Sequence, residues 1–119
     1  MKYPLKGLRV VDTTNNRGEL CGRLLADLGA EVVLVEPSEG SDLRKIAPFS
    51  PTGQSLGFAW RNANKSGVSI DFETQSGCDS FLKLVSTADV WIECGQDLGR
   101  INLEAVLASC PGLVITSIT

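Results

Sequence analysis

The chain alternates between short apolar runs and segments whose apolar residues recur at helical spacing. Residues 31–36, EVVLVE, form a nearly continuous apolar run, which is typical of a strand buried on both faces. In Val68-Ser69-Ile70-Asp71-Phe72 every second residue is apolar, which predicts a half-buried strand. We predict five strands in all, at residues 8–12, 31–36, 68–72, 88–93 and 113–118.

Between these strands, three segments have the apolar spacing of helices. We predict helices at residues 19–28, from Thr74 to about Val85, and around Leu103 to Leu107. Residues 37–57 are dense in Pro, Gly and Ser and predict a long loop, with one helical turn at residues 41–46. Loops of this length inside a compact domain are usually functional or mobile.

This order of elements predicts the fold class. Strands alternating with helices indicate a Rossmann-like, three-layer α/β domain with a mostly parallel sheet of about five strands, in the order 3-2-1-4-5. We expect residues 1–119 to be a single domain. Because the last predicted strand reaches the end of the sequence, we also expect a partial domain with an open sheet edge that invites pairing.

Composition limits the partners, catalytic groups and metal sites that we predict for this chain. The formal net charge is −3, from 14 acidic and 11 basic residues, so no nucleic-acid partner is predicted. The absence of histidine excludes Ser–His and Cys–His dyads and His-ligated metal. The four cysteines form no C-x-x-C pair, and no metal site is predicted. Without a signal peptide or an apolar run long enough to span a membrane, we expect a cytoplasmic protein with reduced thiols and no membrane partner.

A polar and basic stretch, Arg61-Asn62-Ala63-Asn64-Lys65, precedes the third strand. Cations beside amide donors suit recognition of a phosphate. A solvated turn, in which asparagine tolerates left-handed backbone angles, fits the same residues. Composition alone leaves both interpretations open.

A nicotinamide cofactor is a weaker alternative. Glu36 ends the second strand, where an acidic residue can meet a ribose hydroxyl. However, the first strand–helix turn, residues 13–22, contains only Gly18 and Gly22 and does not match G-x-G-x-x-G. Cys94 has no histidine to activate it as a nucleophile.

Six segments in order carry a resemblance to a known family. They are PLKGLRVVDTT at 4–14, LLADLGAEVVLVEP at 24–37, SDLR at 41–44, NANKSGVSIDFET at 62–74, ADVWIE at 88–93 and PGLVITSIT at 111–119. Together they resemble the N-terminal part of the class III CoA-transferases, the family of formyl-CoA transferase, carnitine CoA-transferase and α-methylacyl-CoA racemase.

The resemblance implies coenzyme A or an acyl-CoA as the ligand. It implies that Lys65, beside Asn62 and Asn64, lies near the nucleotide phosphates, and that Arg100 also approaches CoA. The loop of Asn16, Arg17 and Gly18 corresponds to a segment that contacts CoA through its backbone.

This sequence departs from the family pattern at three places. Gly18-Glu19-Leu20 replaces the usual A-G-P, residues 93–96 replace E-N-F-x-P-G, and Pro37 or Ser38 stands where a basic residue is common. The family transfers CoA between carboxylic acids through a downstream catalytic aspartate, which has no match in these residues. We therefore expect no catalytic residue here, no turnover by this chain alone, and a homo-oligomer or a complementing chain as partner. The alternative is a non-catalytic interaction module.

Overall fold

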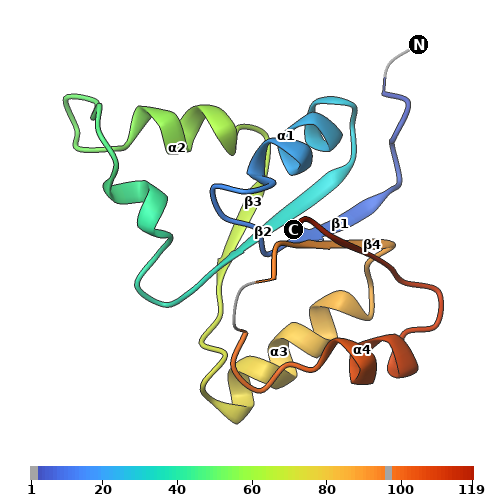
Figure 1. The fold of residues 1–119 in the computed structure, drawn as a ribbon. Helices are drawn as coiled ribbons and strands as arrows, with labels where there is room; N and C mark the ends of the chain where they lie inside the picture. The colour runs from blue at the N-terminus through green and yellow to red at the C-terminus, as the bar shows by residue number, and fades with distance from the viewer. Residues whose placement is uncertain (1–2, 96–97) are drawn as a thin grey trace.

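The computed structural model describes residues 3–95 and 98–119, so Gln96 of the altered motif at 93–96 lies outside the described residues. Helices and strands alternate along the chain (Figure 1). The elements are β1 (Arg9–Asp12), α1 (Glu19–Asp27), β2 (Glu31–Glu36), the 3₁₀ helix η1 (Asp42–Lys45), α2 (Leu56–Arg61), β3 (Ser66–Ser69), α3 (Gln75–Val85), β4 (Val90–Glu93), α4 (Leu103–Ser109) and β5 (Val114–Ser117).

The strands form one five-stranded sheet in the order β3-β2-β1-β4-β5. Every pairing between the described strands is parallel, with Val10 of β1 opposite Val32 of β2 on one side and Val90 of β4 on the other. The predicted α/β class and strand order are therefore confirmed. Because the chain adds strands outward on both sides of β1, the carboxyl end of β1 is where a Rossmann-like sheet usually binds a ligand.

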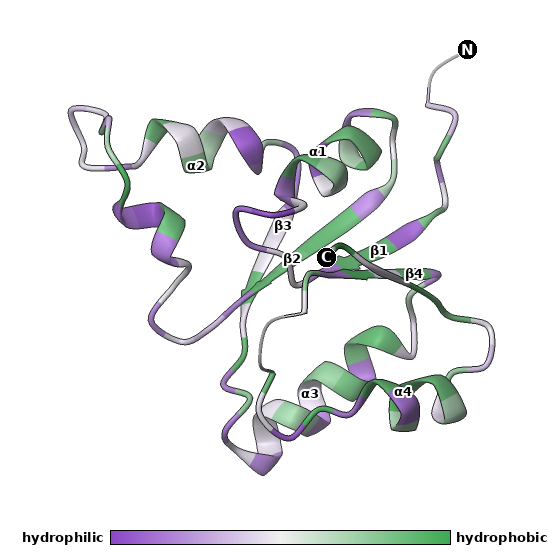
Figure 2. Ribbon diagram, viewed as in Figure 1, coloured by the Kyte–Doolittle hydropathy of each residue, from purple (hydrophilic) through white to green (hydrophobic). Residues whose placement is uncertain are grey.

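Helices cover both faces of the sheet, with α1 and α2 on one side and α3 and α4 on the other (Figure 1). Consecutive strand residues point to opposite faces, so Val10 packs toward α1 and Val11 toward α3 and α4. The larger core lies on the α3 side, where Trp91 and Phe81 meet edge to face at 5.0 Å. Most of β2 is buried, as predicted, and the ribbon of β2 is green over most of its length (Figure 2).

Helix α1 packs on the sheet through one face. Its buried positions are Glu19, Gly22 and Ala26, and Cys21 and Leu25 pack against the same core, whereas Leu20, Leu24 and Leu28 are 43%, 56% and 47% exposed. Three of the four leucines that mark the helical spacing in the sequence therefore face away from the sheet. None of the helices among residues 3–95 and 98–119 is both long and apolar enough to cross a membrane.

Two local predictions were inaccurate. The third strand lies at Ser66–Ser69 instead of 68–72, and all four of its residues are exposed. Among the described strands, β3 is an edge strand that pairs with β2 alone. Helix α2 was missed, since it begins inside the Pro- and Gly-rich segment at residues 37–57 and its six residues are too few to show a clear period. The Ser55 side chain begins α2 by accepting a hydrogen bond from the Phe58 N–H.

Candidate functional site

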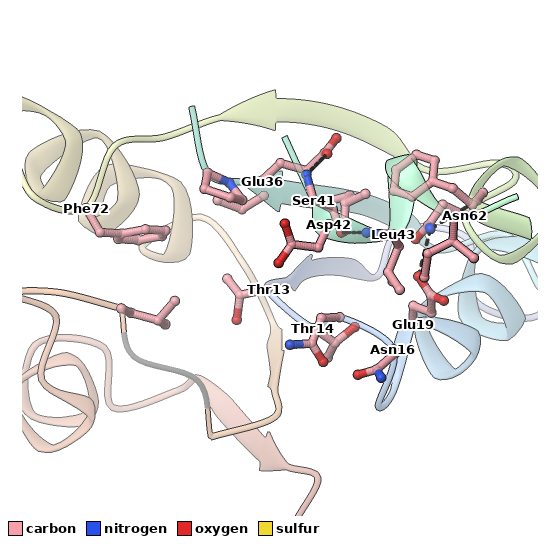
Figure 3. Close-up of a pocket in the computed structure, with 17 residues that line it drawn as sticks. Thr13, Thr14, Asn16, Glu19, Glu36, Ser41, Asp42, Leu43, Asn62 and Phe72 are labelled. Carbon is pink, nitrogen blue, oxygen red and sulfur yellow. Dashed lines mark hydrogen bonds between the residues drawn. The ribbon is translucent and has the colours of Figure 1, made fainter. Parts of the chain in front are cut away.

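A pocket of about 400 Å³ opens at the carboxyl ends of β1 and β2. Its wall comes from the loop after β1, from the segment containing η1, and from the end of α2. Phe72 lies at one end of the pocket, and Glu19 and Asn62 lie at the other (Figure 3). Its volume and its position at the strand ends are those of small-molecule sites in parallel α/β sheets.

An ion pair is buried directly behind this pocket. Lys65 Nζ lies 2.7 Å from Asp12 Oδ2, and the two side chains are 1% and 0% exposed. The same ammonium group donates to the Glu19 carbonyl oxygen and to Asn62 Oδ1, each at 2.7 Å. Three N–H groups thus meet three protein oxygens, so the hydrogen-bonding capacity of this ammonium is filled inside the protein.

The first turn of α1 holds a second buried carboxylate. Glu19 is 3% exposed and accepts hydrogen bonds from Asn62 Nδ2 at 3.0 Å and from Arg61 at 3.3 Å. A carboxylate at this end of a helix is favoured by the helix dipole. Arg61 therefore balances the negative charge of Glu19, and Asn62 donates a further hydrogen bond to it.

Gly22 makes room for the ion pair. A Cβ atom added to Gly22 would overlap Asp12 Oδ2 and would lie 3.0 Å from Lys65 Cε. Helix α1 can cross the Asp12–Lys65 pair at this distance only because position 22 has no side chain.

On the β2 side of the pocket, Arg44 and the Ser41 N–H hold the Glu36 carboxylate, and we call this group the Glu36 clamp. Arg44 binds Glu36 through two hydrogen bonds of 2.7 and 2.6 Å, and the Ser41 N–H donates to the same carboxylate at 2.8 Å. The hydrogen bonds from Arg44 are the main cause that lowers the pKa of Glu36, and the Ser41 N–H lowers it further, against the opposing effect of burial. The guanidinium group also lies 4.1 Å from the centre of the Phe58 ring. Glu36 is therefore already occupied and is not presented to a ribose.

The structure brings together part of the predicted site. Asn16 and Asn62, far apart in the sequence, both line the pocket. Arg17 is exposed in the loop that carries Asn16, and Gly18 follows it with a left-handed φ of 102° at the start of α1. The loop after β1 and the end of α2 are thus neighbours in the fold.

Other predicted residues lie elsewhere. Asn64 has a φ of 68° and donates to Asp27 Oδ1 at 2.6 Å, so it has the conformation of a turn former and does not line the pocket. Arg100 is exposed in the loop after β4, close in sequence to the pocket-lining Leu98. Lys65 is buried behind the pocket wall. Direct contact of these residues with CoA stays a prediction.

Sequence reasoning missed the partner of Lys65. Asp12 lies at the end of a buried strand, where functional groups and turn formers are both common, and no spacing rule links it to a lysine in another segment. The Glu36–Arg44 pair was missed for the same reason. Cys94 is buried, and its thiol donates to Asn15 Oδ1 at 3.4 Å.

Comparison with known proteins gives a consistent result. A family model described as CoA-transferase family III matches residues 5–119. A succinate–glutarate CoA-transferase of Agrobacterium fabrum is 35% identical over 99% of this chain and 32% of its own length. A probable fatty acyl-CoA transferase of Mycobacterium tuberculosis is 41% identical over 76% of this chain and 24% of its own length.

Solved structures agree. The crystal structure of a CaiB/BaiF family protein from Brucella suis matches with a TM-score of 0.88 and 34% identity, over 98% of this chain and 33% of that chain. The chain thus spans about a third or less of the length of these relatives.

Proposed function

Because this chain belongs to CoA-transferase family III, we propose that the pocket at the ends of β1 and β2 binds coenzyme A or an acyl-CoA. The observation that carries the proposal is the shared pocket of Asn16 and Asn62. These residues belong to the two segments that the resemblance assigns to CoA, and the fold makes them neighbours. Arg17 and Arg100 are proposed as further contacts from the exposed loops on either side.

The charges around the pocket suggest which part of CoA enters it. The charged residues of its lining are Glu19, Glu36 and Asp42, all acidic. The two glutamates are compensated by Arg61 and Arg44, so the interior suits an uncharged group that can donate hydrogen bonds. We place the phosphates of CoA outside this interior, toward the exposed Arg17.

The activity that we assign to the whole protein is transfer of CoA between carboxylic acids. The resemblance implies an aspartate that forms a mixed anhydride with the acyl group. The resemblance places that aspartate downstream of the segments matched here, so we propose that these 119 residues bind CoA and do not turn it over alone. Turnover would require that aspartate, whether in the same polypeptide or in a complementing chain.

A calorimetric titration of CoA into the 119-residue chain tests the binding site. We expect saturable binding that Asn16→Trp weakens at least tenfold by filling the pocket mouth, while Lys83→Ala, an exposed change on α3, leaves it unaltered. Reduced nicotinamide cofactor, titrated in parallel, should not bind because Glu36 is occupied by Arg44. Absent CoA binding, or equal binding by wild type and Asn16→Trp, would contradict the proposal.

The second candidate is an interaction module that pairs with another chain. The observation in its favour is the exposed stripe of Leu20, Leu24 and Leu28 along α1. Contiguous apolar surface of this kind commonly marks a protein contact. Both functions can belong to one molecule, because the stripe faces away from the sheet and the pocket lies at its strand ends.

A further inference from the structure

Several polar groups of the pocket wall are hydrogen-bonded to the buried Asp12–Lys65 pair. Thr14, which lines the pocket, donates to Asp12 Oδ1 through its N–H at 2.8 Å and through its hydroxyl at 2.6 Å. On the other side of the pair, Lys65 Nζ holds the Asn62 amide oxygen and the Glu19 carbonyl oxygen, each at 2.7 Å. One ion pair therefore orients wall residues from the loop after β1, from α1 and from the end of α2.

The Asn62 amide connects Lys65 to Glu19 through hydrogen bonds. With its oxygen held by Lys65, the amide nitrogen points to Glu19 Oε2 at 3.0 Å and to the Phe58 carbonyl oxygen at 3.1 Å. Asn62 is 9% exposed and Glu19 is 3% exposed, so losing one of these partners is costly for either side chain. Loss of the lysine would leave the Asn62 oxygen without its donor and free the amide to turn.

We infer that Lys65 is a positioning residue, which shapes the pocket through Asn62 and Glu19 and does not touch a phosphate of the ligand. The inference rests on the proposed CoA site. Its basis is that the ammonium group is 1% exposed, has three internal acceptors, and is neutralised by a carboxylate at 2.7 Å. A phosphate beyond the wall meets a neutral pair whose opposite charges largely cancel at that distance.

The first test uses the ligand-free chain. Hydrogen exchange of the Asn62 side-chain amide, followed by NMR, should be at least tenfold faster in Lys65→Met than in wild type. If the single variant does not fold, the double variant Asp12→Asn/Lys65→Met, which leaves no unpaired charge, should show the same acceleration. Unchanged Asn62 exchange in a folded variant would overturn the inference, whether or not CoA binds.

The second test separates positioning from phosphate contact. Asp12→Asn/Lys65→Met, which removes both charges of the pair, should weaken CoA binding about tenfold, by the same factor at low and at high salt, because no exposed charge pair is lost. A loss that shrinks at high salt would show a direct phosphate contact and refute positioning. If wild type binds no CoA, the proposed function fails and the Asn62 measurement alone decides the role of Lys65.

Discussion

The carboxylate of Asp12 and the ammonium group of Lys65 form an ion pair of 2.7 Å in which neither side chain is more than 1% exposed. The pair joins the end of β1 to the residue just before β3, 53 positions later. Its cost of desolvation is offset by the further hydrogen bonds that both groups make. Removing one partner should therefore cost far more than removing both.

Lys65→Met should lower the free energy of unfolding by about 3–5 kcal/mol, because it leaves a buried carboxylate without its counter-charge. Asp12→Asn/Lys65→Met should be clearly more stable than the single variant. Urea denaturation followed by circular dichroism measures both. Lys83→Met, which removes an exposed lysine on α3, is the matched control and should change stability by no more than about 0.5 kcal/mol. A Lys65→Met variant as stable as the control would contradict a structural role for the pair.

Gly22→Ala should destabilise the protein, although alanine is the better helix former. Its Cβ would overlap Asp12 Oδ2, and neither Asp12 nor Lys65 has free space to move into, so we expect a loss of about 1–3 kcal/mol. Gly57→Ala is the control, since no atom lies within 4 Å of its added Cβ in α2. It should be neutral or stabilising by up to about 1 kcal/mol. Thermal unfolding of both variants gives the comparison, and equal effects would disprove the close packing at Gly22.

The sequence predicted the elements and their order because periodic burial leaves a direct trace in the residues. The run at 31–36 and the spacing of Phe81 and Val85 each indicate their element without knowledge of the rest of the chain. Helix α2 left no such trace, because it is short and has no buried residues. The position of edge strand β3 was mispredicted for a related reason. The apolar alternation that marked it continues beyond the paired residues to Ile70 and Phe72.

The site was harder to predict than the fold. The stretch 61–65 showed that cations and amides gather before β3, but not whether they face a ligand or the protein interior. That choice depends on Asp12 and Glu19, whose proximity arises only when α1 crosses the sheet. Asn64 has the left-handed backbone angle that the turn interpretation expects. Lys65 faces the protein interior because its partner, Asp12, is buried there.

Acid should weaken the fold through Glu36. Its pKa is lowered in the folded state, chiefly by the hydrogen bonds from Arg44. The contribution of Glu36 to the free energy of unfolding is therefore fully present above the unfolded pKa and is lost as the pH falls through the folded pKa. In Arg44→Met this part of the acid sensitivity should disappear. Near neutral pH the variant should be less stable than wild type by about 1 kcal/mol, a small loss because Arg44 is half exposed. Urea midpoints measured from pH 7 to pH 3 test this, with Lys45→Met as a control. Parallel pH profiles for wild type and Arg44→Met would count against the Glu36 clamp.

Leu24→Lys should leave the fold intact and reduce association. Leu24 is 56% exposed at the middle of the α1 stripe, so the substitution should change the free energy of unfolding by no more than about 0.5 kcal/mol. If the stripe packs against a second copy of the chain, sedimentation velocity should show concentration-dependent association of wild type that Leu24→Lys weakens. Leu82→Lys, at a leucine of α3 that is 39% exposed, is the matched control and should associate as wild type does. A wild type that stays monomeric at every concentration would exclude self-pairing through α1, and equal loss in both variants would show that general hydrophobicity, not this stripe, drives association.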